Sequence, residues 1–262
     1  MDGSPRYRTA LVLGGGGMFG AYQAGVWAEL APVFRPDILI GASIGAINAW
    51  AMAAVDNPED WAAHWLDFRE AAGHRFRLPR SPVSGCIDRH AFEEFMRRHH
   101  ARFQPRTPVA VVLTDSLRLR PFIVQTPDVT WRHLAASCGV PLILPQYRLD
   151  GRWCADGGLL ASLPLWAAAE LGVEAAVGVN ILPRGGPAWL RLLRQGLHAA
   201  ARWAPPSRET LRALVIEHPR PLGPLVESTR WRRETAQRWI ELGRQDARAA
   251  RPRLEELLKT FR

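Results

Sequence analysis

Hydrophobic residues along the chain form short continuous runs, and between the runs they recur every three or four positions. The continuous runs predict buried strands at residues 9–13, 37–40, 109–114 and 175–181. Helical spacing fills most of the intervening sequence, at 19–31, 44–54, 59–71, 89–101 and 164–171. This order predicts an α/β fold with a mostly parallel central sheet flanked by helices. A looser alternation at 117–125 contains Pro121, which favours an edge strand.

The pattern changes after Pro183. Glycine and proline there separate basic amphipathic segments, which predict helices at 188–203, 229–249 and 253–261. We therefore expect an α/β core over residues 1–183 and a basic helical extension over 184–262 that packs on it, within a single domain. The chain has 262 residues, of which 47% are hydrophobic and 23% charged, so it can bury one sizeable core.

Charge narrows the choice of partner very little. The formal net charge is +9, and because Lys259 is the only lysine among the 34 basic residues, the other 33 are arginine. A positive excess attracts anionic membrane surfaces and nucleic acid alike. The cysteines are Cys86, Cys138 and Cys154, an odd number without C-x-x-C spacing. This argues against a disulfide framework and a zinc site, and it fits a reducing compartment.

The uncharged segment 38–55 is long enough to resemble a membrane span. Gly41, Ser43, Gly45 and Asn48 interrupt it, however, and a strand, a tight turn and a buried helix account for the same run. The apolar run near the start of the chain has no small-residue cleavage site after it. We therefore expect a cytoplasmic protein.

A glycine-rich loop follows the first predicted strand, in the sequence LVLGGGGMFGAYQAG at 11–25. Gly15, Gly17 and Gly20 fit the G-x-G-x-x-G pattern of dinucleotide sites, but the acidic residue expected after the second strand is missing, since Asp37 precedes that strand. No Gly-Lys-Ser/Thr follows either, which argues against a P-loop. Consecutive backbone N–H groups also suit an oxyanion, and we favour that interpretation.

A second motif, G-x-S-x-G, places Ser43 between Gly41 and Gly45, directly after the second predicted strand and before a helix. This is the context of a nucleophile elbow, in which small neighbours let the strand and the helix approach closely. The alternative is a serine that only caps the helix. Because parallel strands end at one edge of a sheet, the elbow and the glycine loop should face one cleft.

A serine nucleophile needs a base. His198 and His218 are the only histidines late enough for the usual triad order, and because neither follows a predicted strand we expect both on the surface. Asp156, followed by Gly157 and Gly158, is more suggestive, although Asp-Gly is also an ordinary turn signal. A carboxylate acts as a base more readily in an apolar setting. Trp153, Leu159 and Leu160 are candidates for such a wall.

In these residues the sequence resembles the bacterial patatin-like phospholipases over most of its length. The matching elements are the glycine loop GGGGMFGAYQAGV (14–26), the elbow GASIGAINA (41–49), the segment AASCGVPLILP (135–145), the Asp-Gly-Gly turn at 156–158 and the late stretch WIELGRQDA (239–247). The resemblance implies a three-layer α/β sandwich and hydrolysis of lipid acyl esters, of phospholipase A or lysophospholipase type. It implies no metal, no cofactor and no nucleic-acid partner.

The resemblance also implies roles for single residues. Ser43 corresponds to the nucleophile and Asp156 to the base of a Ser-Asp dyad that acts through an acyl-enzyme. The amides of Gly15, Gly16 and Gly17 correspond to the oxyanion hole. Gly41, Gly45, Gly157 and Gly158 correspond to the support of the elbow and the turn.

The sequence departs from the family pattern at two places. Met18 and Phe19 stand where the loop usually carries a basic residue, and Ser162 stands where an asparagine often follows the Asp-Gly-Gly turn. Phe19 is a candidate contact for an acyl chain, which would shift preference from phospholipids toward neutral or short-chain esters.

The segment 188–204 is a candidate membrane contact. Arg191, Arg194 and Arg202 fall on one helical face, with Trp189 and Leu193 among the residues on the rest. A helix that merely covers the core explains the same pattern. The alternative function for the whole chain is a non-enzymatic lipid- or nucleotide-binding protein that uses the glycine loop to capture an anion.

Overall fold

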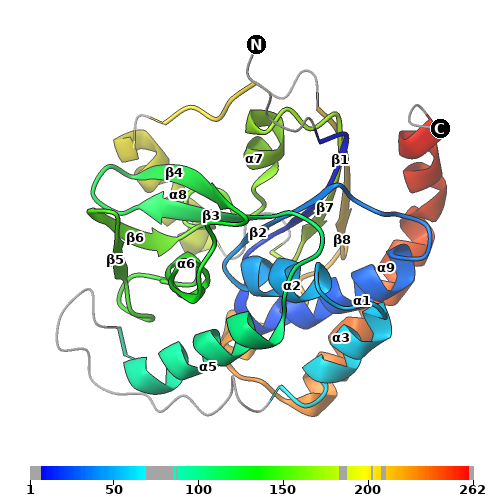
Figure 1. The fold of residues 1–262 in the computed structure, drawn as a ribbon, viewed down its shortest axis with the longest axis horizontal. Coiled ribbons are helices and arrows are strands. Elements are labelled where there is room, and N and C mark those ends of the chain that lie inside the picture. The colour runs from blue at the N-terminus through cyan, green and yellow to red at the C-terminus, as the bar shows by residue number, and fades with distance from the viewer. Residues whose placement is uncertain are drawn as a thin grey trace.

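The protein is represented by a computed structural model that describes residues 7–68, 85–86, 88–182, 188–201, 203–207 and 211–259. Within these ranges, eight strands form one sheet (Figure 1). Its parallel part has the order β3-β2-β1-β7-β8, with bounds Val109–Asp115, Ile38–Ala42, Thr9–Leu13, Ala175–Asn180 and Arg212–Glu217. The antiparallel part adds β4 (Arg120–Gln125) and β6 (Arg152–Asp156), which both pair with β3, and β5 (Tyr147–Leu149), which pairs with β6.

The strands confirm most of the hydrophobic pattern. Each of the four predicted buried runs is a strand of the sheet, and β4 is the predicted edge strand, paired with β3. Strand β8 was not predicted, because its residues lie in the stretch assigned to helices. It is buried at Leu214 and Ile216, whereas Arg212 and Glu217 at its ends are exposed. The sheet therefore extends into the region 184–262 that the sequence assigned to helices alone.

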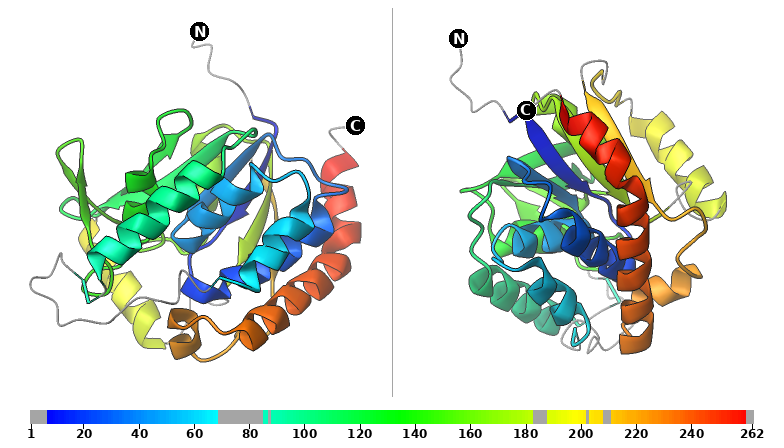
Figure 2. Two further views of the ribbon diagram at one scale, coloured as in Figure 1. Left: turned by 60° about the horizontal axis from the view of Figure 1, so that its bottom comes forward. Right: turned by 90° about the vertical axis from the view of Figure 1, so that its right-hand side faces the viewer.

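Successive residues of a strand point to opposite faces of the sheet, and here they pack in two separate hydrophobic cores. The sheet with helices on both faces is a three-layer sandwich. Leu11 and Leu13 belong to the larger core, beneath α1 (Gly20–Leu30), α2 (Ile44–Met52), α3 (Pro58–Trp65), α5 (Arg89–Arg102), α6 (Trp131–Ser137) and α9 (Arg233–Leu258). Ala10 and Val12 belong to the smaller core, which α7 (Leu165–Glu170) covers. Helix α8 (Ala188–Ala201) lies on the side of the sheet away from α1 (Figure 2).

The last helix corrects another expectation. The segments 229–249 and 253–261 were predicted as separate helices, but α9 runs unbroken from Arg233 to Leu258 with Pro252 inside it. Buried Ala250 and Leu254 flank the proline and pack on the same core, which holds the two halves in line. Helix α9 also lies very close to α1. A Cβ on Gly25 would stand 2.0 Å from the Ile240 carbonyl oxygen, so only glycine permits this approach.

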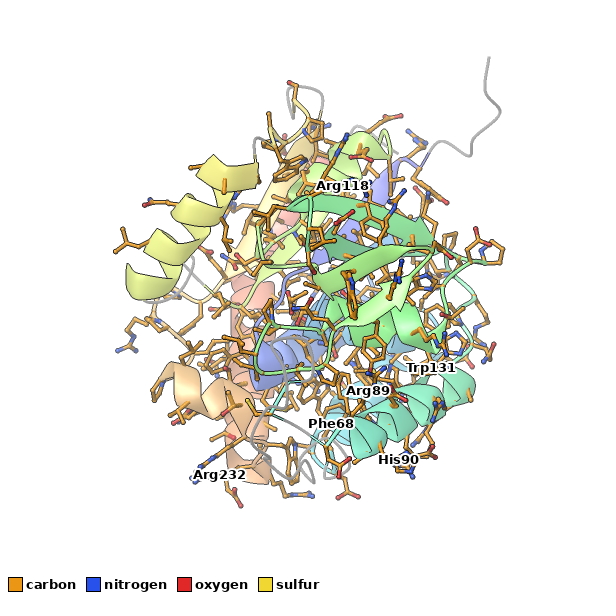
Figure 3. All side chains as sticks on the ribbon, turned by 90° about the vertical axis from the view of Figure 1, so that its left-hand side faces the viewer. Phe68, Arg89, His90, Arg118, Trp131 and Arg232 are labelled. Carbon is orange, nitrogen blue, oxygen red and sulfur yellow. The ribbon has the colours of Figure 1, made fainter. Side chains whose placement is uncertain are left out.

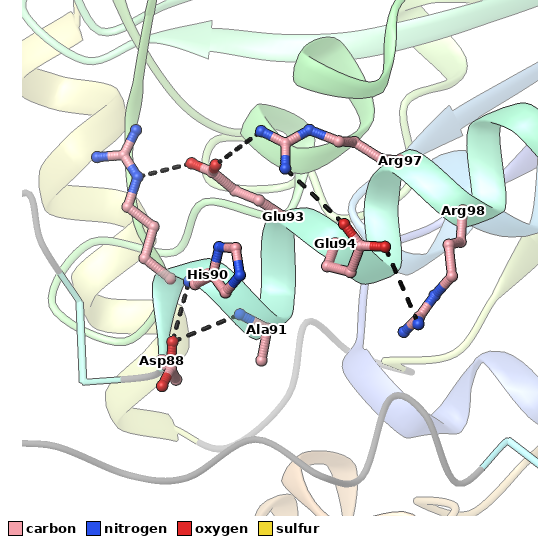
Figure 4. A network of polar contacts seen from close by, with 8 residues as sticks. Asp88, His90, Ala91, Glu93, Glu94, Arg97 and Arg98 are labelled. Carbon is pink, nitrogen blue, oxygen red and sulfur yellow. Dashed lines mark hydrogen bonds and ion pairs between the residues drawn. The ribbon is translucent and has the colours of Figure 1, made fainter.

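Helix α5 supports the helix that follows the predicted elbow. It begins at the Asp88 cap, whose Oδ1 accepts hydrogen bonds from the N–H groups of His90 (3.0 Å) and Ala91 (3.4 Å), as Figure 4 shows. Its inner face carries His99, whose ring lies 3.1 Å from the Ile47 carbonyl oxygen of α2. Since a carbonyl only accepts, Nε2 of His99 donates. Burial lowers the pKa of His99 to about 3, so this histidine is neutral.

Candidate active site

Ser43 occupies the turn between β2 and α2 in a strained conformation, with φ 56° and ψ −129°. The residue is 7% exposed. The two motif glycines allow the sharp turn, because a Cβ on Gly41 would stand 2.3 Å from the Gly45 carbonyl oxygen. A Cβ on Gly45 would likewise stand 2.3 Å from the Leu13 carbonyl oxygen. The turn thus brings α2 against the end of β1, where the glycine loop starts.

Strand pairing places Asp156 next to this turn. One edge of β3 pairs with β4 along residues 110–115. The other edge pairs first with β2, whose last residue Ala42 stands opposite Val112, and then with β6, whose last residue Asp156 stands opposite Leu113. Strands β2 and β6 therefore approach each other end to end, and Ser43 and Asp156 lie where they meet.

Asp156 is held by its own turn. It is 6% exposed, its Oδ1 accepts a 2.7 Å hydrogen bond from the Gly158 N–H, and its carbonyl oxygen accepts one of 2.9 Å from the Thr114 hydroxyl. Gly157 is required by packing, because a Cβ there would stand 2.0 Å from the Val112 carbonyl oxygen. The turn thus fixes the carboxylate against the end of β3.

Cys138 borders both residues. Burial, and after it the charge of Asp156, raise the pKa of the Cys138 thiol above its usual range. A hydrogen bond between the Cys138 and Ser43 side chains opposes that change. The thiol is therefore protonated.

The glycine loop closes the site from the β1 side. The Cβ position of Gly15 is 3.1 Å from Ser43 Cβ, and that of Gly158 is 3.8 Å from Gly15 Cα. The Gly15 N–H donates a 2.8 Å hydrogen bond to the Ser162 carbonyl oxygen, so it is engaged. Among the described residues, the N–H groups of Gly16 and Gly17 have no such partner. The candidate oxyanion donors are therefore Gly16 and Gly17.

A buried polar chain that the sequence analysis did not identify supports the loop. The Gly14 carbonyl oxygen accepts a hydrogen bond of 2.8 Å from Gln23 Nε2, and Asn48 Nδ2 donates to Gln23 Oε1 at 2.7 Å. The Asn48 oxygen accepts from the indole N–H groups of Trp61 (3.1 Å) and Trp65 (3.0 Å). The sequence signal for this chain is the presence of Gln23 and Asn48 in otherwise apolar helices, because a buried side-chain amide requires hydrogen-bond partners.

The expectation about Phe19 needs revision. Phe19 is 2% exposed, and its ring centroid lies 5.0 Å from that of Trp239 on α9, so it packs in the core and does not offer a surface to an acyl chain. Trp153 lines a hollow of about 290 Å³ with Trp131, Arg89 and other residues. Figure 3 labels Arg89 and Trp131, two of the residues that line this hollow. Leu160, by contrast, is buried in the turn after Asp156.

The two late histidines are both partly buried and not on the open surface as expected. His198 Nε2 lies 2.6 Å from the Leu160 carbonyl oxygen, and its ring stacks on Trp203. His218 follows the unpredicted strand β8, and its Nδ1 lies 2.9 Å from Asp246 Oδ2, which also accepts a 2.8 Å hydrogen bond from the Tyr22 hydroxyl. Because β8 is three positions from β2 in the sheet, His218 is roughly 14 Å from the elbow strand.

The described part of the chain contains neither a metal-binding cluster nor a membrane-spanning helix. No group of three or more His, Cys, Asp or Glu side chains there is arranged to hold a metal ion. None of its helices combines the length and apolar character needed to span a bilayer. In α8, Leu192 is 66% exposed. The side chains of Trp189, Arg191, Leu193 and Arg194 lie outside the described residues, as does Arg202.

Comparisons with known proteins bear on the family and the fold of the chain. A family model described as patatin-like phospholipase matches residues 11–169. Patatin-like phospholipase domain-containing protein 7 of Rattus norvegicus is 26% identical over 184 residues, which are 66% of this chain and 13% of the relative. An uncharacterized NTE family protein of Mycobacterium bovis is 28% identical over 184 residues, which are 68% of this chain and 50% of the relative.

A solved structure supports the fold. The crystal structure of VipD from Legionella pneumophila aligns with a TM-score of 0.50 at 12% identity, over 94% of this chain and 66% of VipD. At this identity the similarity concerns the fold alone. The chain also spans only half of the mycobacterial relative and a smaller share of the rat protein.

Proposed function

The chain belongs to the patatin-like phospholipase family, and on that premise we propose that it is a serine acyl hydrolase that cleaves lipid acyl esters through a Ser43–Asp156 dyad. The observation that carries the proposal is the meeting of β2 and β6 on one edge of β3, with a strained serine at one strand end and a buried aspartate at the other. Family membership supports lipid hydrolysis in general, and the dyad gives it a mechanism.

In the proposed acylation step, the Ser43 oxygen attacks the ester carbonyl carbon while Asp156 accepts the hydroxyl proton. The carbonyl oxygen becomes an oxyanion, for which the N–H groups of Gly16 and Gly17 are the candidate donors. When the intermediate collapses, the bond to the leaving alcohol breaks and that alcohol takes the proton from Asp156. The acyl group remains on Ser43.

Deacylation repeats the step with water. Asp156 removes a proton from a water molecule, the water oxygen attacks the acyl carbon, and the same donors hold the second oxyanion. Collapse releases the fatty acid and returns the proton to Ser43. The hydrogen bond from Gly158 to Asp156 Oδ1 keeps the carboxylate oriented during both steps. No histidine takes part in this scheme.

The proposed substrate is a phospholipid or lysophospholipid ester at a membrane surface, reached through peripheral contact by α8. The exposed Leu192 on this helix supports the contact. His198 on the same helix bonds the Leu160 carbonyl oxygen, which joins α8 to the turn that carries Asp156. An apolar residue with basic neighbours in sequence is typical of interfacial helices.

The alternative is a non-enzymatic protein that binds a lipid or nucleotide anion with the glycine loop. The engaged Gly15 N–H removes one loop donor from either function, so it does not decide between them. Labelling with a fluorophosphonate, followed by mass spectrometry, distinguishes the two. A tag on Ser43 that is absent from Ser43→Ala supports the hydrolase, whereas tight nucleotide binding without a tag supports the alternative.

A further inference from the structure

The segment Ser137–Cys138–Gly139, at the carboxyl end of α6, contacts the candidate nucleophile and the candidate base together. The Ser137 hydroxyl accepts a 2.9 Å hydrogen bond from the Ser43 N–H. Two residues later, the Gly139 carbonyl oxygen accepts one of 3.0 Å from the Asp156 N–H, and the Ser137 carbonyl oxygen accepts one of 3.1 Å from the Gly157 N–H. One short segment thus bonds the backbone on both sides of the strand junction.

The Ser137 hydroxyl is itself oriented. It donates a 2.7 Å hydrogen bond to the Val112 carbonyl oxygen, which leaves its oxygen lone pairs for the Ser43 N–H. Val112 is the β3 residue opposite Ala42, the last residue of β2. The Ser137 hydroxyl therefore lies between β3 and the end of β2. It links the Ser43 N–H to the Val112 carbonyl oxygen through one side chain, and we call this pair of hydrogen bonds the bridge.

The bridge acts on a residue that is under strain. Ser43 has φ 56°, a backbone conformation that a residue with a Cβ adopts only when its surroundings impose it. Ser137 is fully buried, so water does not replace its hydroxyl if that group is removed. Both the Ser43 N–H and the Val112 carbonyl oxygen would then lose their partner.

From these contacts we propose that Ser137 is a positioning residue, whose hydroxyl holds the Ser43 backbone so that the nucleophile stays aligned with Asp156. The inference rests on the proposed hydrolase function and adds to it a residue that does not touch substrate. Displacement of a reacting group by about 1 Å can cost on the order of 100-fold in rate. Loss of the bridge should therefore slow acylation and leave substrate binding almost unchanged.

The test measures the rate of fluorophosphonate labelling of Ser43, together with kcat and KM for a short-chain nitrophenyl ester, in three variants. Ser137→Ala removes the bridge, and Ser137→Cys keeps its shape with weaker hydrogen bonds. Thr9→Val is the matched control, because Thr9 is a buried residue whose hydroxyl donates to Asp37 Oδ2 (3.1 Å) at the opposite end of β1.

We expect labelling and kcat to fall about 100-fold in Ser137→Ala and by an intermediate factor in Ser137→Cys, with KM changed by less than about twofold. Thr9→Val should keep wild-type rates even if its melting temperature falls. If Ser137→Ala does not fold, the smaller loss expected in Ser137→Cys still tests the inference. Labelling of the folded Ser137 variants at the wild-type rate, or an equal loss in Thr9→Val, overturns the inference. A wild-type protein that is not labelled at Ser43 overturns the proposed function instead.

Discussion

Ser43 and Asp156 flank a single point on β3: Ala42, just before the serine, pairs with Val112, and Asp156 pairs with Leu113. The two residues are 113 positions apart in the chain but sit at the ends of two strands that share one edge. This arrangement supports the proposed Ser43–Asp156 dyad, and it leads to the first two predictions.

Replacing Ser43 should abolish ester hydrolysis without loss of stability. Ser43→Ala keeps the strained backbone and should melt near the wild-type temperature. Ser43→Gly relieves the strain at φ 56°, which costs on the order of 1 kcal/mol, so its melting temperature should rise by about 2–4 °C. Activity assays and calorimetry on both variants check this. Residual activity close to wild type in either would exclude Ser43 as the nucleophile.

Asp156→Asn should remove most activity, because an amide cannot accept the serine proton but fills the same space. His198→Ala and His218→Ala should retain turnover within about threefold. The ring of His198 is hydrogen-bonded to the Leu160 carbonyl oxygen and that of His218 to the Asp246 carboxylate. Steady-state kinetics on the three variants make the comparison. A histidine variant as inactive as Asp156→Asn would point to a triad in place of the dyad.

Phe19→Arg should destabilise the protein and lower hydrolysis of phospholipids and neutral esters alike. Phe19 is 2% exposed and packs on Trp239, so an arginine would lose that contact and bury a charge, at a cost of roughly 3 kcal/mol or more. Phe19→Leu is the control and should lose less. Thermal melts and assays with both substrates decide. A gain on phospholipid relative to the neutral ester would show that the side chain reaches substrate.

Membrane contact through α8 should depend on Leu192. Leu192→Asp, alone or with Arg191→Glu and Arg194→Glu, should weaken binding to anionic vesicles, and the charge reversals should also flatten its salt dependence. Leu117→Asp is the matched control, because Leu117 is 79% exposed and lies in the turn between β3 and β4. Sedimentation with vesicles measures both. Equal effects of the two leucine variants would assign α8 to covering the core.

The buried His99 should make the protein less stable in acid. Its folded pKa, lowered by burial to about 3, lies below the unfolded value of 6.5, so the unfolded chain binds the proton first. The contribution of neutral His99 to the free energy of unfolding is therefore fully present above about pH 6.5. It is lost as the pH drops toward 3, by roughly 1 kcal/mol per pH unit. Nearby His64, His100 and Arg102 act in the same direction.

Urea unfolding between pH 7 and 4 measures this slope. His99→Phe should be less stable at pH 7, because it lacks the hydrogen bond to Ile47, and it should lose most of the pH dependence. His90→Gln is the control, since His90 is exposed at the start of α5, and its slope should match the wild type. An unchanged slope in His99→Phe would assign the acid sensitivity to other groups.

Much of the fold follows from the sequence, because local patterns carry it. Continuous apolar runs mark β1, β2, β3 and β7, whose side chains are buried on both faces of the sheet. The glycines of the elbow and of the Asp-Gly-Gly turn are visible because close backbone approach excludes every other residue. Strand β8 was not predicted, because charged residues flank its few buried positions. Helix α9 was predicted as two helices, because proline inside a helix usually ends it and Pro252 lies within this one.

What only the tertiary structure decided is which groups meet. The sequence put Ser43 in a turn and Asp156 in another, but their proximity depends on β6 taking over the edge of β3 where β2 ends. The hydrogen bond from the Gly15 N–H to the Ser162 carbonyl oxygen is one such contact, and no local pattern in the glycine loop indicates it. The burial of Phe19 is another, because Trp239 of α9, more than 200 residues later, packs against its ring. Hydrogen-bond partners and burial are set by contacts distant in the chain, which no local pattern records.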